Sequence, residues 1–259
     1  MTVPNGFTPW RLAAPLLVVA LAACGTDGVN APRLSAAANA IVNADVAAVT
    51  ADGVGEDVEL MRGPGGQFAI GLSADRGRFE CDNVARQGLT VTRTCVFKDA
   101  AGNTQSAYDS LTTASVQVKA TVTGELTRGP MTMTVDRVRE MVVTGLAGHE
   151  TTATWNGTGR GSMTRVRTSE SGETRQYEMT YTVRRTNVVI PVPRTATSWP
   201  LSGTITKSYT VKFTGGPNDG KTVTREVVVT FNGTATPVAT INGESWELDL
   251  SDRGKRRRP

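Results

Sequence analysis

The chain has little of the chemistry on which enzymes and metal centres depend. Its 259 residues include one histidine and three cysteines, and they contain no GxSxG, HExxH, CxxC or Gly-rich phosphate-loop motif. The single histidine, His149, precedes Glu150 in a Gly-containing segment that is typical of a loop, and neighbouring residues of an extended chain point in opposite directions. We therefore expect a surface position for His149, a protein that is not an enzyme, and no metal or cofactor.

The sequence also lacks an excess of basic residues outside one short run. The formal net charge is +4, but four cations form one terminal run, which consists of Lys255, Arg256, Arg257 and Arg258. The remaining residues are therefore close to neutral, which excludes the basic face that nucleic acids require. We expect residues 252–259 to form a disordered, solvated tail, and the alternative is that the run attracts an anionic polymer or lipid headgroups.

No apolar run near the start is long enough for a membrane span. The run from Leu12 to Ala20 is interrupted by Pro15 and is shorter than the roughly 20 residues that a span needs. It follows Arg11 and ends in the small residues of Leu21-Ala22-Ala23-Cys24. A charged start, an apolar middle and a small-residue exit are typical of a secretory leader. A cysteine at this exit resembles the lipobox of bacterial lipoproteins.

The resemblance implies how the chain is processed and where in the cell it is located. In that family the cysteine thiol, here Cys24, carries a diacylglycerol, the leader is cut before it, and the new N-terminus is acylated. Gly25 is not the Asp that marks retention at the inner membrane, so the resemblance implies export to the outer membrane of a cell with two membranes. The alternatives are an ordinary cleaved leader with Cys24 as a chance thiol, or an N-terminal span.

The sequence predicts a single folded domain between a leader with its tether and a terminal tail. We expect a leader at 1–23, a lipidated flexible tether at 24–34, a β-rich domain at 35–251 and the basic tail at 252–259. A helix is predicted over 35–52, with Ser35 as its N-cap and Gly53 at its end. The acidic residues Asp52, Glu56, Asp57 and Glu59 fit no calcium loop, so we expect them to be solvated.

The two remaining cysteines, Cys81 and Cys95, predict a disulfide. In an exported protein, two leftover cysteines this close in sequence favour a bridge. The loop of about 15 residues that such a bridge would close stabilises a fold by roughly 3 kcal/mol. The alternative is two buried free thiols, and the spacing disfavours a metal pair.

After Gly63-Pro64-Gly65-Gly66 the apolar pattern changes to the period of two that is typical of strands. The clearest strand runs from Leu201 to Thr214, with Ile205, Tyr209, Val211 and Phe213 on one face and Lys207 among them. Asn242-Gly243 predicts a type I′ hairpin. We expect a mainly β fold, an antiparallel meander that forms a curved sheet or barrel with one N-terminal helix, because its apolar face must be covered.

The sequence favours a non-enzymatic envelope lipoprotein that acts as a binding or structural module. Its expected partners are the membrane, through the lipid on Cys24, and an anionic envelope polymer or headgroups, through the basic run. The first alternative is a carrier or chaperone for lipids or other apolar ligands, which requires an open apolar cavity of several hundred Å³. The second is an enzyme with two carboxylates about 5–10 Å apart in a cleft. Trp155, Trp199 and Trp246 are predicted to fill the core rather than to stack on sugars.

Overall fold

The computed structural model describes residues 34–62, 71–73, 78–81, 84–86, 88–128, 131–168, 174–192, 195, 197–251 and 256–257. The predicted leader, Cys24 and the tether up to residue 33 lie outside these ranges. Within them, no helix is both long enough and apolar enough to cross a membrane.

The described residues form one long helix followed by many strands. Helix α1 spans Ala36–Arg62, and a short 3-10 turn, η1, spans Gly216–Asn218. The strands are β1 (Gly71–Ser73), β2 (Arg78–Glu80), β3 (Val84–Arg86), β4 (Leu89–Asp99), β5 (Thr104–Gln105), β6 (Thr113–Arg128), β7 (Met131–Thr144), β8 (Thr152–Thr168), β9 (Thr174–Pro191), β10 (Ser202–Thr214), β11 (Thr222–Thr230), β12 (Val238–Ile241), β13 (Glu244–Leu248) and β14 (Arg256–Arg257).

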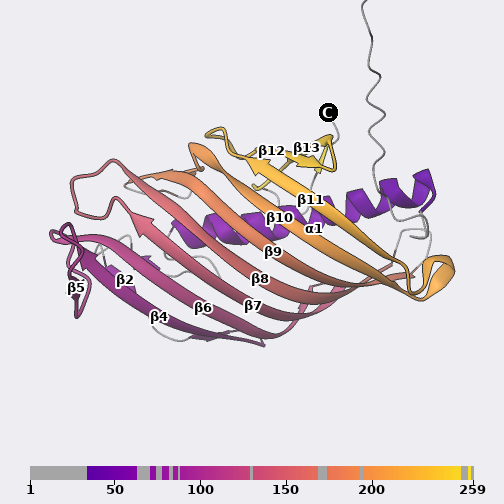
Figure 1. Cartoon of the computed structure of the whole chain (residues 1–259), viewed down its shortest axis with the longest axis horizontal. Helices are drawn as coiled ribbons and strands as arrows, with labels where there is room; N and C mark the ends of the chain where they lie inside the picture. The colour runs from indigo at the N-terminus through magenta and orange to yellow at the C-terminus, as the bar shows by residue number, and fades with distance from the viewer. Residues whose placement is uncertain are drawn as a thin grey trace, which may run out of the picture. The chain divides into compact units, whose positions relative to one another are not determined.

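Most of these strands belong to one antiparallel sheet that follows the order of the chain. The sheet has 12 strands in the order β14-β13-β12-β11-β10-β9-β8-β7-β6-β4-β3, with β5 paired to β4 beside this path, and β1 and β2 form a separate pair. Among the described strands the two ends of the path, β3 and β14, do not pair with each other, so the sheet is not closed. The predicted mainly β meander with one N-terminal helix is confirmed (Figure 1).

Helix α1 begins as predicted but ends later. The Ala38 N–H donates to Ser35 Oγ at 3.2 Å, which is the expected N-cap bond. The helix does not stop at Gly53 but continues to Arg62. A Cβ at Gly53 would lie 2.6 Å from Lys207 Nζ, so this glycine allows a close approach to the sheet instead of terminating the helix. Burial of Val54, Val58 and Met61 outweighs the poor helix propensity of Gly53 and Gly55.

The predicted alternation and hairpin are confirmed in the C-terminal half. In β10, Ile205, Tyr209 and Val211 are buried, and so is Lys207, which lies on the same face. Asn242 and Gly243 have φ of 47° and 87°, as a type I′ turn between β12 and β13 requires.

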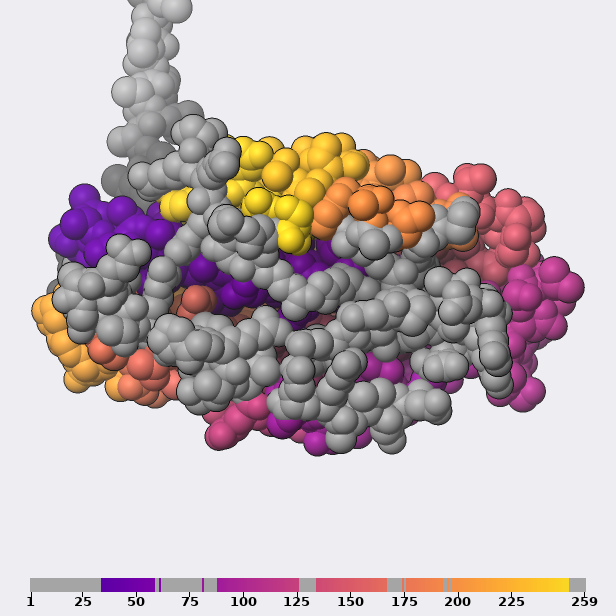
Figure 2. Space-filling view, turned by 180° about the vertical axis from the view of Figure 1, so that it is seen from behind, coloured from indigo at the N-terminus to yellow at the C-terminus, as the bar shows by residue number. Residues whose placement is uncertain are grey.

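Helix α1 covers one face of the sheet, here called the inner face. Figure 1 shows α1 behind the long strands, and in Figure 2 the helix (indigo) lies beside the C-terminal strands (yellow), which it contacts at β11 to β13. The core between them includes Met61 of α1, Trp155 and Tyr209, all fully buried. Trp246 is also buried and Trp199 is half-buried against this core, so all three described tryptophans pack as predicted.

The predicted disulfide is present between Cys81 and Cys95, whose Cα atoms are 6.0 Å apart. This bond fixes the residue that follows β2 to the middle of β4. In the predicted disordered tail, Arg256–Arg257 instead form strand β14, which pairs with Leu248 and Glu247 of β13, and 252–255 and 258–259 lie outside the described residues.

Candidate functional site

The polar residues of α1 make hydrogen bonds with the inner face of the sheet. Near the start of the helix, Arg225 of β11 donates from Nε to Asn43 Oδ1 at 2.6 Å and from Nη2 to Asn39 Oδ1 at 2.7 Å. Further along, the Tyr177 hydroxyl donates to Asp45 Oδ2 at 2.8 Å, and the Thr50 hydroxyl donates to the Tyr209 oxygen at 3.2 Å. These bonds fix the position of α1 along the sheet, because a displaced helix would leave buried polar groups without their hydrogen-bond partners.

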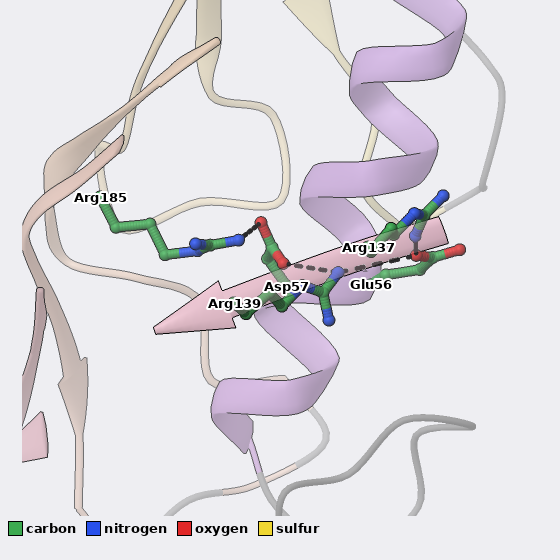
Figure 3. Close-up of polar contacts among 5 residues, drawn as sticks. All are labelled: Glu56, Asp57, Arg137, Arg139 and Arg185. Atoms are coloured by element: carbon green, nitrogen blue, oxygen red, sulfur yellow. Dashed lines mark hydrogen bonds and ion pairs between the residues drawn. The ribbon is translucent and has the colours of Figure 1, made fainter. Parts of the chain in front are cut away.

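Near the end of α1, six charged side chains form a buried charge cluster, which consists of Glu56, Asp57, Arg137, Arg139, Arg185 and Lys207. All six are at most 6% exposed. Arg139 Nη2 lies 3.1 Å from Asp57 Oδ1 and Arg185 Nη2 lies 2.7 Å from Asp57 Oδ2, while Arg137 donates to Glu56. Figure 3 shows Arg185 and Arg139 reaching Asp57 from different sides.

This cluster corrects the prediction for two of the four acidic residues, Glu56 and Asp57, whereas the side chain of Glu59 lies outside the described residues. Glu56 and Asp57 are buried and ion-paired, not solvated. Their partners come from β7 and β9, which lie far away in sequence. Buried carboxylates persist in a fold only when such partners compensate for the loss of hydration.

Glycines of β8 make room for the cluster. Gly161 pairs with Arg137 and Tyr181, and Gly159 pairs with Arg139, so both glycines lie between the long side chains of β7 and β9. A Cβ at Gly161 would lie 2.6 Å from the Tyr181 hydroxyl and 3.0 Å from Arg137 Cγ. The absence of side chains on this stretch of β8 allows the arginines to lie across the inner face of the sheet.

The cluster shifts the pKa values of its members. Burial alone would raise the pKa of Asp57, but the charges of Arg185 and Arg139 outweigh it and lower the pKa to about 2. The pKa of Glu56 is also lowered, since Arg137 and Arg139 outweigh burial. Burial lowers the pKa of Lys207 to about 8; attraction by Asp57 opposes this shift and repulsion by Arg137 and Arg185 adds to it.

The opposite face of the sheet, here called the outer face, is rich in hydroxyl groups. One row crosses seven neighbouring strands, and all but one of its residues are Ser or Thr. The row consists of Thr90, Thr123, Asp136, Ser162, Thr180, Thr210 and Thr224, all of them exposed. This row follows from the predicted alternation of apolar and polar residues, because successive side chains of a strand point to opposite faces of the sheet.

Two adjoining depressions of about 450 and 440 Å³ form a shallow outer groove across β7 to β10. Both are lined by Val138, Arg160, Thr182 and Ser208. The remaining outward-facing side chains that carry polar groups and line it are Asp136, Glu140, Thr158, Ser162, Thr180, Arg184, Thr206 and Thr210. The acidic and basic residues of the groove are equal in number, so it is nearly neutral and dominated by hydroxyls.

The predicted site residues do not meet in one place. Cys24 lies outside the described residues, and so do Lys255 and Arg258 of the basic run. Cys81 and Cys95 form their disulfide away from the groove, and His149 is exposed in a loop, as predicted. Among the described side chains, no three His, Cys, Asp or Glu residues are arranged to hold a metal ion.

The sequence did contain a signal for the buried charge cluster. Arg137 and Arg139 are in phase with Val135 and Met141 on β7, and Lys207 is in phase with Ile205 and Tyr209 on β10. Charged residues in the inward phase of a strand require a buried counter-charge, and the acidic residues of α1 are the ones that supply it.

Comparison with models of known protein families, with curated protein sequences and with solved structures finds no match for this chain.

Replacement of Asp57 by Asn should destabilise the fold strongly. It leaves Arg139 and Arg185 buried without their carboxylate, so we expect the free energy of unfolding to fall by about 3–5 kcal/mol in urea titrations at pH 7. The matched control is Glu178→Gln, which breaks an ion pair with Lys212 whose side chains are each 51% exposed; that pair should contribute less than about 1 kcal/mol. Equal losses in Asp57→Asn and Glu178→Gln would contradict the assignment.

The ion pairs of Asp57 also predict a loss of stability in acid. The folded-state pKa of Asp57 lies below the ordinary 3.8, so the stabilisation that this carboxylate provides is present above pH 4 and is lost as the pH falls toward 2.

The lowered pKa of Lys207 predicts that the folded protein becomes more stable at alkaline pH. Its folded-state pKa of about 8 lies below the ordinary 10.5, so the unfolded chain binds the additional proton between these values. The free energy of unfolding should therefore increase from pH 8 to pH 10, on the order of 2 kcal/mol, in denaturant titrations. Lys207→Met should abolish this rise, whereas the exposed Lys212→Met should retain it. A flat wild-type profile would show that Lys207 carries no such proton change.

Proposed function

We propose that this protein is a lipid-anchored bacterial envelope protein that binds a neutral, hydroxyl-rich polymer, such as a glycan, in its outer groove. The observation that carries the proposal is the hydroxyl composition of this groove. Ser and Thr hydroxyls each donate one hydrogen bond and accept up to two, so they match the mixed donors and acceptors of sugar hydroxyls. The groove is shallow and runs across four strands, which suits a chain-like ligand better than a compact one.

The charges of the groove support a neutral ligand over an anionic one. Asp136 and Glu140 of β7 balance Arg160 of β8 and Arg184 of β9. A polyanion such as a nucleic acid would require an excess of cations at its binding face. Guanidinium groups next to carboxylates can still donate several hydrogen bonds to sugar oxygens. The basic run Lys255–Arg258 is a separate proposed contact, with anionic envelope polymer or headgroups.

The anchor is the second part of the proposal. The lipobox resemblance at Leu21–Cys24 supports a lipid on Cys24, and Gly25 favours the outer membrane. The disulfide between Cys81 and Cys95 supports an exported location, because such bonds persist in oxidising compartments.

The structure favours the binding module over the two alternatives. A carrier of apolar ligands requires an open apolar cavity, whereas α1 lies on the inner face, and the cavity that described residues line beside the charge cluster measures about 10 Å³. An enzyme with paired carboxylates has no support in the groove, since Asp136 and Glu140 are four residues apart on one strand, or roughly 13 Å. Of the carboxylates near the inner face, Glu56 and Asp57 are held by arginines, and Asp45 accepts a hydrogen bond from Tyr177.

The anchor is tested by fractionation of cells that express the wild type or Cys24→Ala. We expect the wild type in the membrane fraction and the variant outside it, because one acylated cysteine supplies the membrane affinity. Mass spectrometry of the purified wild type should show acyl chains on Cys24 and no residues before it. A wild-type chain that retains Met1 and carries no lipid would contradict the anchor.

The groove is tested by co-sedimentation with an insoluble neutral glucan. The protein is the chain from residue 24 onward with Cys24→Ser, so that no lipid contributes to sedimentation. The double variant Thr180→Val/Thr182→Val removes two hydroxyls from the groove, and we expect about tenfold weaker binding to the glucan. The control is Thr222→Val/Thr224→Val, which removes two exposed hydroxyls of β11 outside the groove. Failure of the unmodified protein to bind the glucan, or equal losses in the two variants, would contradict the proposal.

A further inference from the structure

A small cavity lies within the buried charge cluster, apart from the outer groove. Its volume is about 10 Å³, which is room for one water-sized or monatomic group. It is bounded by α1 on one side and by the strands β7 to β10 on the other. The lining residues that bear on its chemistry are Gly53, Asp57, Arg137, Arg139, Arg185 and Lys207.

The charges around this cavity do not balance. Four cationic side chains, Arg137, Arg139, Arg185 and Lys207, face the two carboxylates Glu56 and Asp57. All six groups are buried, so solvent screens the excess poorly. Loss of the proton from Lys207 is one way to reduce the excess, and capture of an anion is another.

The hydrogen-bond donors of the cluster are also incompletely used. Arg185 is 2% exposed, and its Nε and Nη1 find no acceptor among the described residues, although Nη2 is bonded to Asp57. The Nε of Arg137 also finds no acceptor within the described ranges. Buried guanidinium donors without acceptors are costly, so each of them favours the binding of an additional acceptor.

We propose that a single chloride ion occupies this cavity. A monatomic anion fits the volume, accepts hydrogen bonds from several guanidinium groups at once and removes one unit of the positive excess. Phosphate, sulfate and carboxylate ligands are too large for a space of this size, and a cation would be repelled by the four cationic groups. Water is the competing occupant, since it accepts hydrogen bonds but leaves the charge unbalanced. Asp57 repels the ion, and the four cations outweigh this single carboxylate.

Occupation of the cavity would attach α1 more firmly to the sheet. The ion would contact arginines of β7 and β9 that also hold Glu56 and Asp57 of the helix. Chloride would then bind to the folded protein and not to the unfolded chain, so its concentration would set the stability of the fold. This proposal is independent of the ligand of the outer groove.

The test measures the thermal unfolding midpoint, Tm, of the purified chain while chloride replaces gluconate at constant ionic strength. Gluconate is too large for the cavity. We expect Tm to stay constant well below the Kd and then to rise with the logarithm of the chloride concentration, by about 3–5 °C at a tenfold excess over the Kd. Arg185→Lys retains a cation beside Asp57 but removes the two unpaired donor atoms, Nε and Nη1, so the chloride-dependent rise should be lost. Asp57→Asn removes the repelling carboxylate, so the rise should begin at a lower chloride concentration.

The matched control is Arg184→Lys, a neighbouring arginine on the exposed face of the same strand, which should retain the full rise. A general salt effect would give equal rises in Arg185→Lys and Arg184→Lys, and this result would overturn the proposal. Crystals of the wild type grown in bromide provide a second measurement if Arg185→Lys does not fold. An anomalous peak beside Arg185 supports the site, and water alone in a bromide-saturated crystal overturns it.

Discussion

The structure depends on the burial of a partly polar helix against an open sheet. Most of α1 between Asp45 and Val58 is buried, although it carries Asp45, Thr50, Glu56 and Asp57. An apolar helix could slide or rotate on an apolar sheet at little cost, whereas the partners of these polar groups lie at fixed places on the sheet. The ion pairs of Glu56 and Asp57 therefore specify where the helix lies, while the surrounding valines, alanines and aromatic rings supply the apolar burial.

The sheet is adapted to this helix at a few positions. The glycines of β8 leave space for the arginines of β7, and Gly53 of the helix leaves space for Lys207. Each of these glycines by itself weakens the helix or strand that contains it. Together they allow six charged groups to share a volume that ordinary side chains would fill. The same strands present hydroxyl groups on their other face, so one alternating pattern produces both the buried charge cluster and the outer groove.

The sequence predicted the fold class because strand alternation, the Ser35 N-cap and the Asn242-Gly243 turn are local signals. It also predicted the disulfide, since few cysteines left few choices. It did not predict the end of α1 or the burial of Glu56 and Asp57. Those depend on Arg137 and Arg185, which are 80 to 130 residues away in sequence and whose register is fixed only when the sheet forms. The outer groove was missed for a similar reason, because a row of Thr and Ser residues becomes a surface only after the strands pair.

The order of partners along the chain has a consequence for assembly. Helix α1 is the first described element to emerge during synthesis, yet its contacts lie on β7, β9, β10 and β11. Most of the stability of a helix in a protein comes from tertiary packing, so this segment cannot dock, and its acids stay hydrated, until residues beyond Arg225 are available. The first segment of this domain to be synthesised is thus the last to dock, and a chain truncated before β11 would leave the inner face of its strands uncovered by α1.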